Sequence, residues 1–98
     1  MDKHLIIECL DLVLKEAELA ILRKENIHYN NGYKMVVDKT IEMIRNNQNI
    51  VTILNQIKEY KKEGQTHPLS LFSEGLIDGS NEVMNIIYDN IGQDNYDE

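Results

Sequence analysis

Three carboxylates recur at intervals of four residues late in the chain, at Glu74, Asp78 and Glu82. On one continuous helix this spacing stacks them on a single face, with Asp89 nearly in line. Like charges four residues apart repel each other by a few tenths of a kcal/mol when exposed, and a partner carrying Lys or Arg reverses that sign. We interpret these four residues as candidate contacts for a basic protein, such as one whose groove normally holds nucleic-acid phosphates.

Two simpler explanations of the acidic row stay open at this point. A solvated acidic face aids solubility without binding anything. Alternatively, Lys58, Lys61 and Lys62 neutralise the row within the fold.

Metal and catalytic chemistry find little support in the sequence. The segment 78–82 does not have the ligand spacing of an EF-hand loop. His4 and Glu8 are four residues apart and supply only two ligands, and Cys9 lies on an apolar face without a base beside it. No Gly-rich phosphate loop or Gly-x-Ser-x-Gly motif occurs. We therefore predict no enzyme activity, no metal site and no cofactor.

The charge of the chain is divided unevenly along its length. Residues 1–64 hold all ten Lys and Arg residues and ten acidic ones, so the net charge of −7 belongs to residues 65–98. A surface of this sign repels phosphates, which argues against direct nucleic-acid binding. The expected partner is a protein with a basic surface.

A second candidate patch surrounds an Asn-Asn-Gly sequence. Tyr29 and Tyr33 flank it, and tyrosine is favoured in contact surfaces because it combines a large apolar ring with one polar end. Tyr29, Tyr33 and Lys34, or Arg23 and Lys24, could form the mouth of a small-ligand site between helices. An oligomer that sequesters a small ligand is therefore the alternative function, and a purely structural subunit is a further one.

Length and composition indicate one helical domain over residues 1–92, followed by an acidic flexible tail at 93–98. A single cysteine cannot form an intrachain disulfide, which favours a reducing, cytoplasmic location. The apolar N-terminal segment is interrupted by charged residues, so neither a signal peptide nor a membrane span is expected.

The first helix is predicted from Lys3 to Glu25, with Asp2 as its N-cap. Its apolar residues cover about two-thirds of the circumference, which is wider than the stripe of about 100° of an ordinary surface helix. It is therefore expected to be the central helix or a subunit interface. We predict a homodimer through this helix, with these interface residues: Leu5, Leu12 and Leu19.

A turn is predicted across residues 26–34, because Asn-Asn-Gly tolerates positive φ. The second helix should then run from Tyr33 to Arg45 and end at Asn46 and Asn47. The third is expected over residues 48–63 with Gly64 just after its end, and a single helix kinked across 46–49 is the alternative. The predicted inward residues of these two helices are Val36, Val37, Thr40, Ile41 and Ile44, then Ile50, Ile53, Leu54, Ile57 and Tyr60.

Residues 68–91 keep one helical phase, with Pro68 as a candidate start and Gly92 as the end. They form either one bent helix or two helices separated at 78–80. The fold class predicted is an all-α bundle of four helices, or five if this last segment breaks. The leading functional hypothesis is a small acidic cytoplasmic binding protein that occludes a basic partner surface, as an inhibitor, antitoxin-like or anti-defence factor of a mobile element does.

Overall fold

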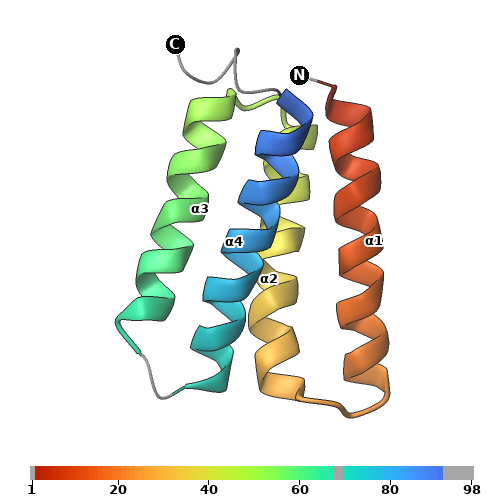
Figure 1. Cartoon of the computed structure of the whole chain (residues 1–98), viewed down its shortest axis with the longest axis vertical. Helices are drawn as coiled ribbons and strands as arrows, with labels where there is room; N and C mark the ends of the chain where they lie inside the picture. The colour runs from red at the N-terminus through yellow and green to blue at the C-terminus, as the bar shows by residue number, and fades with distance from the viewer. Residues whose placement is uncertain (1, 68–69, 92–98) are drawn as a thin grey trace.

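A computed structural model describes residues 2–67 and 70–91. These residues form an all-helical bundle of α1 (Lys3–Leu22), α2 (Ile27–Arg45), α3 (Ile50–Gln65) and α4 (Leu71–Ile91), and they contain no strand. Successive helices run in opposite directions, so α1 begins at the same end of the bundle at which α4 finishes (Figure 1). The predicted all-α class is confirmed. The alternative of a fifth helix is wrong, because α4 continues through residues 78–80 without a break.

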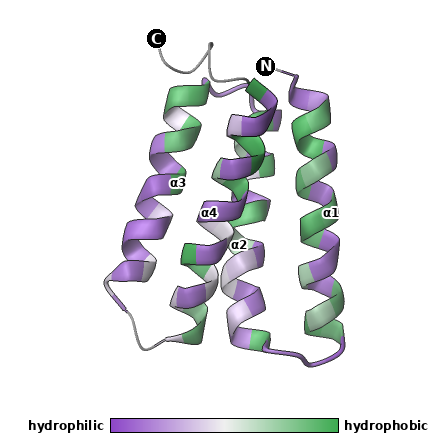
Figure 2. Cartoon of the chain, viewed as in Figure 1, coloured by the Kyte–Doolittle hydropathy of each residue, from purple (hydrophilic) through white to green (hydrophobic). Residues whose placement is uncertain are grey.

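The centre of the bundle is the pair α2 and α4. Both central helices contact the other three, whereas α1 and α3 do not touch each other within the described residues. Of the two expectations for the first helix, the central position is therefore wrong, and the subunit interface stays a prediction. Only Ile6, Leu10 and Ala17 of α1 are buried, although hydrophobic residues recur along the whole length of its ribbon in Figure 2. The wide apolar face of α1 is therefore only partly covered by other helices of the same molecule.

The core is built mainly from aliphatic side chains of α2, α3 and α4. All five predicted inward residues of the second helix are buried. In α3 the central residues Ile53, Leu54 and Ile57 are buried, and Ile50 and Tyr60 are half-buried at its edges. Helical periodicity therefore identified the buried faces correctly, because each of these helices has a single apolar stripe.

The predicted turn over residues 26–34 is wrong, and the connection is shorter. α1 ends at Leu22, and α2 already begins at Ile27. Lys24 (φ 61°) and Asn26 (φ 42°) supply the left-handed backbone of the turn. The side-chain amide of Asn30 donates to the carbonyls of Glu25 and Asn26, which stabilises the start of α2.

Gly32 explains why an Asn-Asn-Gly sequence lies inside a helix. A Cβ at this position would overlap the carbonyl oxygen of Phe72 and lie 3.2 Å from the amide nitrogen of Leu76. The glycine is therefore needed for close contact between α2 and α4 rather than for positive φ. The local turn preference is overridden by packing.

Side-chain caps support the starts of α1, α3 and α4, and at α4 Ser70 accepts from the Ser73 amide at 3.3 Å. Asp2 accepts from the Leu5 amide, which confirms the predicted N-cap of α1, and Asn49 accepts from the Thr52 amide at the start of α3. The chain leaves the helical conformation at Asn47 (φ 60°), so the single kinked helix is wrong. Gly64 lies inside the last turn of α3, not after it, where a Cβ would be 2.7 Å from the Ser73 carbonyl oxygen. Pro68, Gly92 and the tail at 93–98 lie outside the described residues.

Candidate functional site

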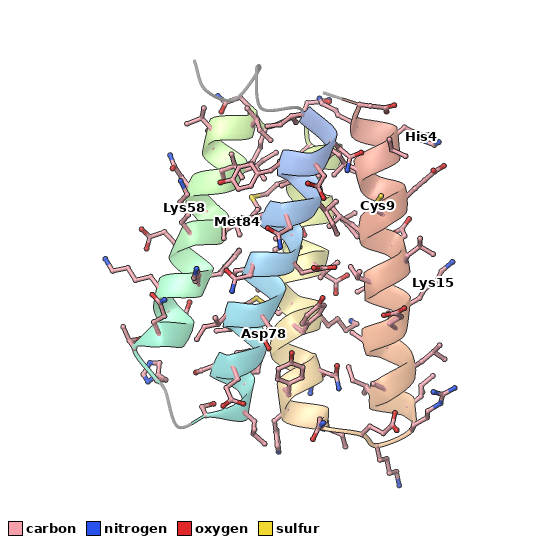
Figure 3. The ribbon with its side chains drawn as sticks, in the orientation of Figure 1. His4, Cys9, Lys15, Lys58, Asp78 and Met84 are labelled. Carbon is pink, nitrogen blue, oxygen red and sulfur yellow. The ribbon has the colours of Figure 1, made fainter. Side chains whose placement is uncertain are left out.

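The acidic row lies along one uninterrupted helix. Glu74, Asp78 and Asp89 of α4 are exposed and Glu82 is half-buried, whereas the opposite side of α4 packs into the core. In Figure 3 the labelled Asp78 lies on the side of α4 that faces the viewer. The fold of α4 thus places the predicted carboxylates on a rigid outer surface, which we call the acidic face (Glu74, Asp78, Glu82 and Asp89).

Among the residues that the structure describes, no Lys or Arg forms an ion pair with this face. The ion pairs present join His4 to Glu8 and Lys34 to both Glu18 and Asp38. Lys58 lies on the outer side of α3, away from α4 (Figure 3). Neutralisation of the row by the lysines of α3 is therefore not seen, and the negative charge of the face stays accessible to another molecule.

Two tyrosines of α2 border the acidic face. The Tyr29 hydroxyl donates a 2.6 Å hydrogen bond to Oδ2 of Asp78, and the rings of Tyr29 and Tyr33 lie 6.2 Å apart at a tilt of 39°. Their position follows from the glycines of α4, since Gly75 and Gly79 both meet the α2 backbone at Tyr33. The structure thus brings the two tyrosines and part of the acidic row into one surface.

The charges around the tyrosines affect their acidity. Partial burial, then the hydrogen bond and charge of Asp78, raises the pKa of Tyr29 well above its ordinary value. Burial, followed by the charges of Glu82 and Glu16, raises the pKa of Tyr33 to about 12. Both phenols are therefore neutral hydrogen-bond donors at physiological pH.

Glu16 of α1 is a member of this surface that the sequence did not identify. It lines a cavity of about 230 Å³ between α1 and α2 together with Tyr29 and Tyr33, whose other lining residues are Val13, Ala17 and Asn30. Nothing in the spacing of Glu16 relates it to residues 29 or 82. Only the packing of α1 on α2 brings its charge close to Tyr33.

The remaining residues of the predicted ligand patch are dispersed. Arg23 and Lys24 lie exposed in the turn between α1 and α2. Lys34 pairs with Asp38 at 3.1 Å and with Glu18 at 4.0 Å. None of these three cations lines the cavity beside the tyrosines.

The leucines predicted for a subunit interface lie on the outside of α1. Leu5, Leu12 and Leu19 are 44%, 66% and 48% exposed, and Leu22 is 78% exposed. Seven-residue intervals bring the first three onto one side of the helix. This side is unpartnered within the described residues.

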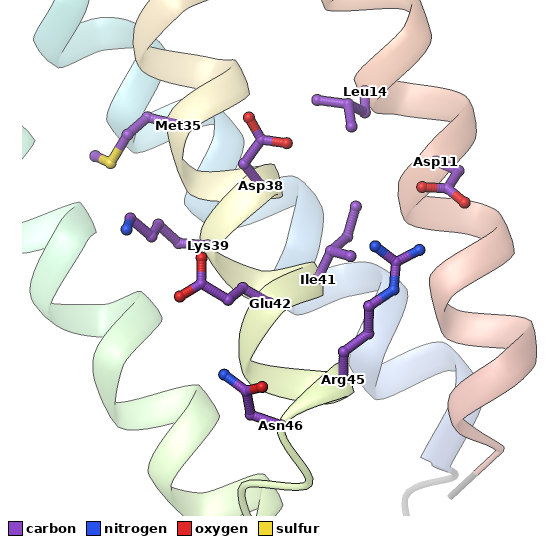
Figure 4. A pocket seen from close by; sticks show the side chains of 9 residues that line it. All are labelled: Asp11, Leu14, Met35, Asp38, Lys39, Ile41, Glu42, Arg45 and Asn46. Carbon is purple, nitrogen blue, oxygen red and sulfur yellow. The ribbon is translucent and has the colours of Figure 1, made fainter.

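A larger open pocket of about 610 Å³ lies between α1 and α2 (Figure 4). It is lined by Asp11, Leu14, Met35, Asp38, Lys39, Ile41, Glu42, Arg45 and Asn46. Three carboxylates and two cations line it, so the pocket does not favour a ligand of one charge. The described residues contain no group of three or more His, Cys, Asp or Glu side chains placed to hold a metal ion.

In the part of the chain that the structure describes, no helix has both the length and the apolar character needed to cross a lipid bilayer. No family model, curated protein or solved structure matches this chain.

Proposed function

We propose that this chain is a small acidic cytoplasmic binding protein that covers a basic surface of another protein, acting as an inhibitor of the antitoxin-like or anti-defence type. The observation that carries the proposal is the acidic face on a single continuous helix without an ion pair to a Lys or Arg of the described chain. A rigid row of carboxylates is pre-organised, so little conformational entropy is lost when a partner's cations bind to it.

The tyrosines give such a partner a place to anchor an arginine. A guanidinium can stack on an aromatic ring while it donates to a carboxylate, and the ring of Tyr29 adjoins Asp78. Tyrosine and arginine are enriched among the residues that dominate binding energy. The expected centre of the contact is therefore Tyr29, Tyr33 and Asp78, with Glu74, Glu82 and Asp89 extending it along α4.

The position of Asp89 supports a binding role for the row. It lies near the C-terminal end of α4, where the helix dipole favours cations, and the last turn of this helix contains no basic residue. A carboxylate there opposes the stability of the helix, so an external role accounts for it better than folding does.

The proposal includes a homodimer through the exposed leucines of α1, Leu5, Leu12 and Leu19. A second candidate function is sequestration of a small ligand by such an oligomer, and the cavity beside Tyr29 and Tyr33 is the one that involves the predicted ligand residues. Its volume of about 230 Å³ lies below the usual range of ligand pockets, about 300–1,000 Å³. Mass spectrometry of the gently purified protein under native conditions tests this candidate, because a retained small molecule would support it. A purely structural subunit has no observation of its own in its favour.

The test of the leading proposal compares three baits in an affinity capture from the lysate of the native host. The first is the wild type, and the second is the triple variant Glu74→Lys, Asp78→Lys, Glu82→Lys. The third is a matched control that makes the same change of charge at exposed positions outside α4, Glu42→Lys, Glu59→Lys and Glu63→Lys. Circular dichroism establishes that all three baits are folded.

A partner retained by the wild type and the control but lost by the α4 variant is the expected result. Its binding should also weaken as salt is raised, since exposed charges are screened beyond about 8 Å at physiological ionic strength. Equal recovery by all three baits, or binding that does not depend on salt, would show that the acidic face is not the contact surface.

A further inference from the structure

The outer side of α1 has a more regular pattern than three leucines. Six residues follow one another at alternating intervals of three and four: Leu5, Glu8, Leu12, Lys15, Leu19 and Leu22. All six are exposed. This is the spacing of the contact positions of a two-helix coiled coil. We call these residues the outer seam of α1.

The charges within the outer seam distinguish two ways of pairing α1 with a second copy. Glu8 lies in the N-terminal half of the seam and Lys15 in the C-terminal half. In a parallel pair each residue faces its own counterpart, so Glu8 meets Glu8 and Lys15 meets Lys15. In an antiparallel pair the half that carries Glu8 faces the half that carries Lys15, and opposite charges meet twice.

Two further features agree with the antiparallel arrangement. Antiparallel neighbours place the positive end of each helix dipole beside the negative end of the other. Glu8 and Lys15 are also accessible. Among the described residues the one ion pair of Glu8 is to the exposed His4, at 3.1 Å, and Lys15 points away from the bundle in Figure 3. We propose that two copies of this chain associate through the outer seams of α1 in antiparallel orientation, with the two-fold axis close to Leu12.

The orientation determines where the acidic faces lie, and this consequence rests on the function proposed above. In Figure 3 Lys15 points to the side of the bundle, whereas Asp78 lies on the face toward the viewer. An antiparallel pair joined at that side is related by an axis that points toward the viewer. Rotation about this axis keeps both acidic faces on the same side of the dimer. A parallel pair would turn them to opposite sides.

The dimer would therefore offer one partner two acidic faces at once. Binding to an elongated or two-fold symmetric basic surface would gain from the high effective concentration of the second face. The kind of partner that fits is a basic protein that is itself dimeric or has a long cationic groove.

A charge exchange tests the orientation by sedimentation velocity. In the antiparallel pair Glu8→Lys sets a cation against Lys15 of the other copy, so dimer affinity should fall about tenfold. The double variant Glu8→Lys, Lys15→Glu should recover it. In a parallel pair each residue still faces an identical residue of the other copy. The fall in dimer affinity with Glu8→Lys and its recovery in the double variant would then not be seen. That outcome, or a wild type that is monomeric, would overturn the proposal.

Cysteine cross-linking in a Cys9→Ala background gives an independent reading. Leu5→Cys mixed with Leu19→Cys should form a mixed disulfide, whereas Leu5→Cys alone should not. With the axis at Leu12 its two copies are about 21 Å apart at 1.5 Å of rise per residue, which is beyond the reach of a disulfide. Ready cross-linking of Leu5→Cys alone would overturn the antiparallel arrangement. Failure of the dimer is separable from failure of the proposed function, because a monomer can still bind a basic partner through α4.

Discussion

Gly75 of α4 lies directly against the main chain of α2 at Tyr29. A Cβ at position 75 would overlap the Tyr29 carbonyl oxygen and lie 2.8 Å from the Tyr33 amide nitrogen. This close approach of the two central helices places the Tyr29 hydroxyl within 2.6 Å of Asp78. The packing of the bundle and the geometry of the acidic face therefore depend on the same glycine.

We expect Gly75→Ala to lower the free energy of unfolding by about 2–3 kcal/mol, because backbone atoms on α2 have to move away. Gly79→Ala is the matched variant. Its added Cβ would lie 3.0 Å from the Tyr33 carbonyl oxygen, and alanine is the better helix former, so its loss should be clearly smaller. Urea denaturation measures both. Equal stability of Gly75→Ala and the wild type would contradict the close packing.

The positions of these glycines show where sequence reasoning succeeds and where it fails. Gly75 and Gly79 share one helical phase with the apolar residues of α4, so a continuous helix was one of the two predicted arrangements. The role of Gly32 could not be anticipated, since Asn-Asn-Gly is a common turn sequence and the atom that excludes a side chain belongs to Phe72, forty residues later. Short-range preferences carry no information about such a contact.

The candidate site was also predictable only in part. Spacing by four located the acidic row, because helical periodicity is a local property. The bond between Tyr29 and Asp78 and the proximity of Glu16 to Tyr33 depend on how three helices pack. For the same reason the sequence could not decide between a central position for α1 and a subunit interface. An apolar face indicates that a helix needs cover, and it does not say whether the cover comes from the same molecule.

The raised pKa values of Tyr29 and Tyr33 predict a loss of stability in alkaline solution. In the folded protein the neutral phenol is favoured, so the contribution of each tyrosine to stability is complete below the ordinary pKa of 10.0. It is lost as the pH rises above that value, through the pKa of about 12 for Tyr33 and at still higher pH for Tyr29. Tyr29→Phe should reduce the decline in this window. Urea denaturation at a series of pH values compares the variant with the wild type. The same decline in both proteins would show that Tyr29 is not involved.

Ser80→Ala should stabilise the protein. Ser80 is fully buried in α4, and its hydroxyl has no hydrogen-bond partner among the described residues. Removing a buried, unsatisfied oxygen and introducing a better helix former should add about 0.5–1 kcal/mol. Thr40→Val is the contrasting variant, because the Thr40 hydroxyl donates to the Val36 carbonyl at 2.8 Å and no comparable gain is expected. Thermal unfolding measures both variants, and a loss of stability in Ser80→Ala would contradict the expectation.

Glu74 and Asp89 lie near opposite ends of α4, so neutralising them should change stability in opposite directions. Glu74 is in the first turn, where the helix dipole favours a carboxylate, and Asp89 is near the last, where it does not. Glu74→Gln should cost about 0.3–1 kcal/mol, and Asp89→Asn should gain a similar amount. Chemical denaturation at low salt measures the difference, and raised salt should reduce it. Changes of the same sign would show that the dipole does not govern these positions.

The variants Glu74→Gln and Asp89→Asn also distinguish an effect on binding from an effect on stability. Once a partner has been captured, both variants should weaken its binding, measured by calorimetry, although only Asp89→Asn stabilises the fold. A variant that is more stable and yet binds less tightly cannot owe its defect to unfolding. If Asp89→Asn bound as well as the wild type, Asp89 would lie outside the contact.

The attachment of α1 has a consequence for how the molecule opens. Because α1 touches α2, lies along one edge of α4 and has no contact with α3 in the described chain, it can detach while the other three helices stay packed. Its amide hydrogens should then exchange with deuterated solvent sooner than those of α2 and α4. Self-association through the outer seam would slow that exchange. The protection of the α1 amides from exchange would therefore increase with protein concentration.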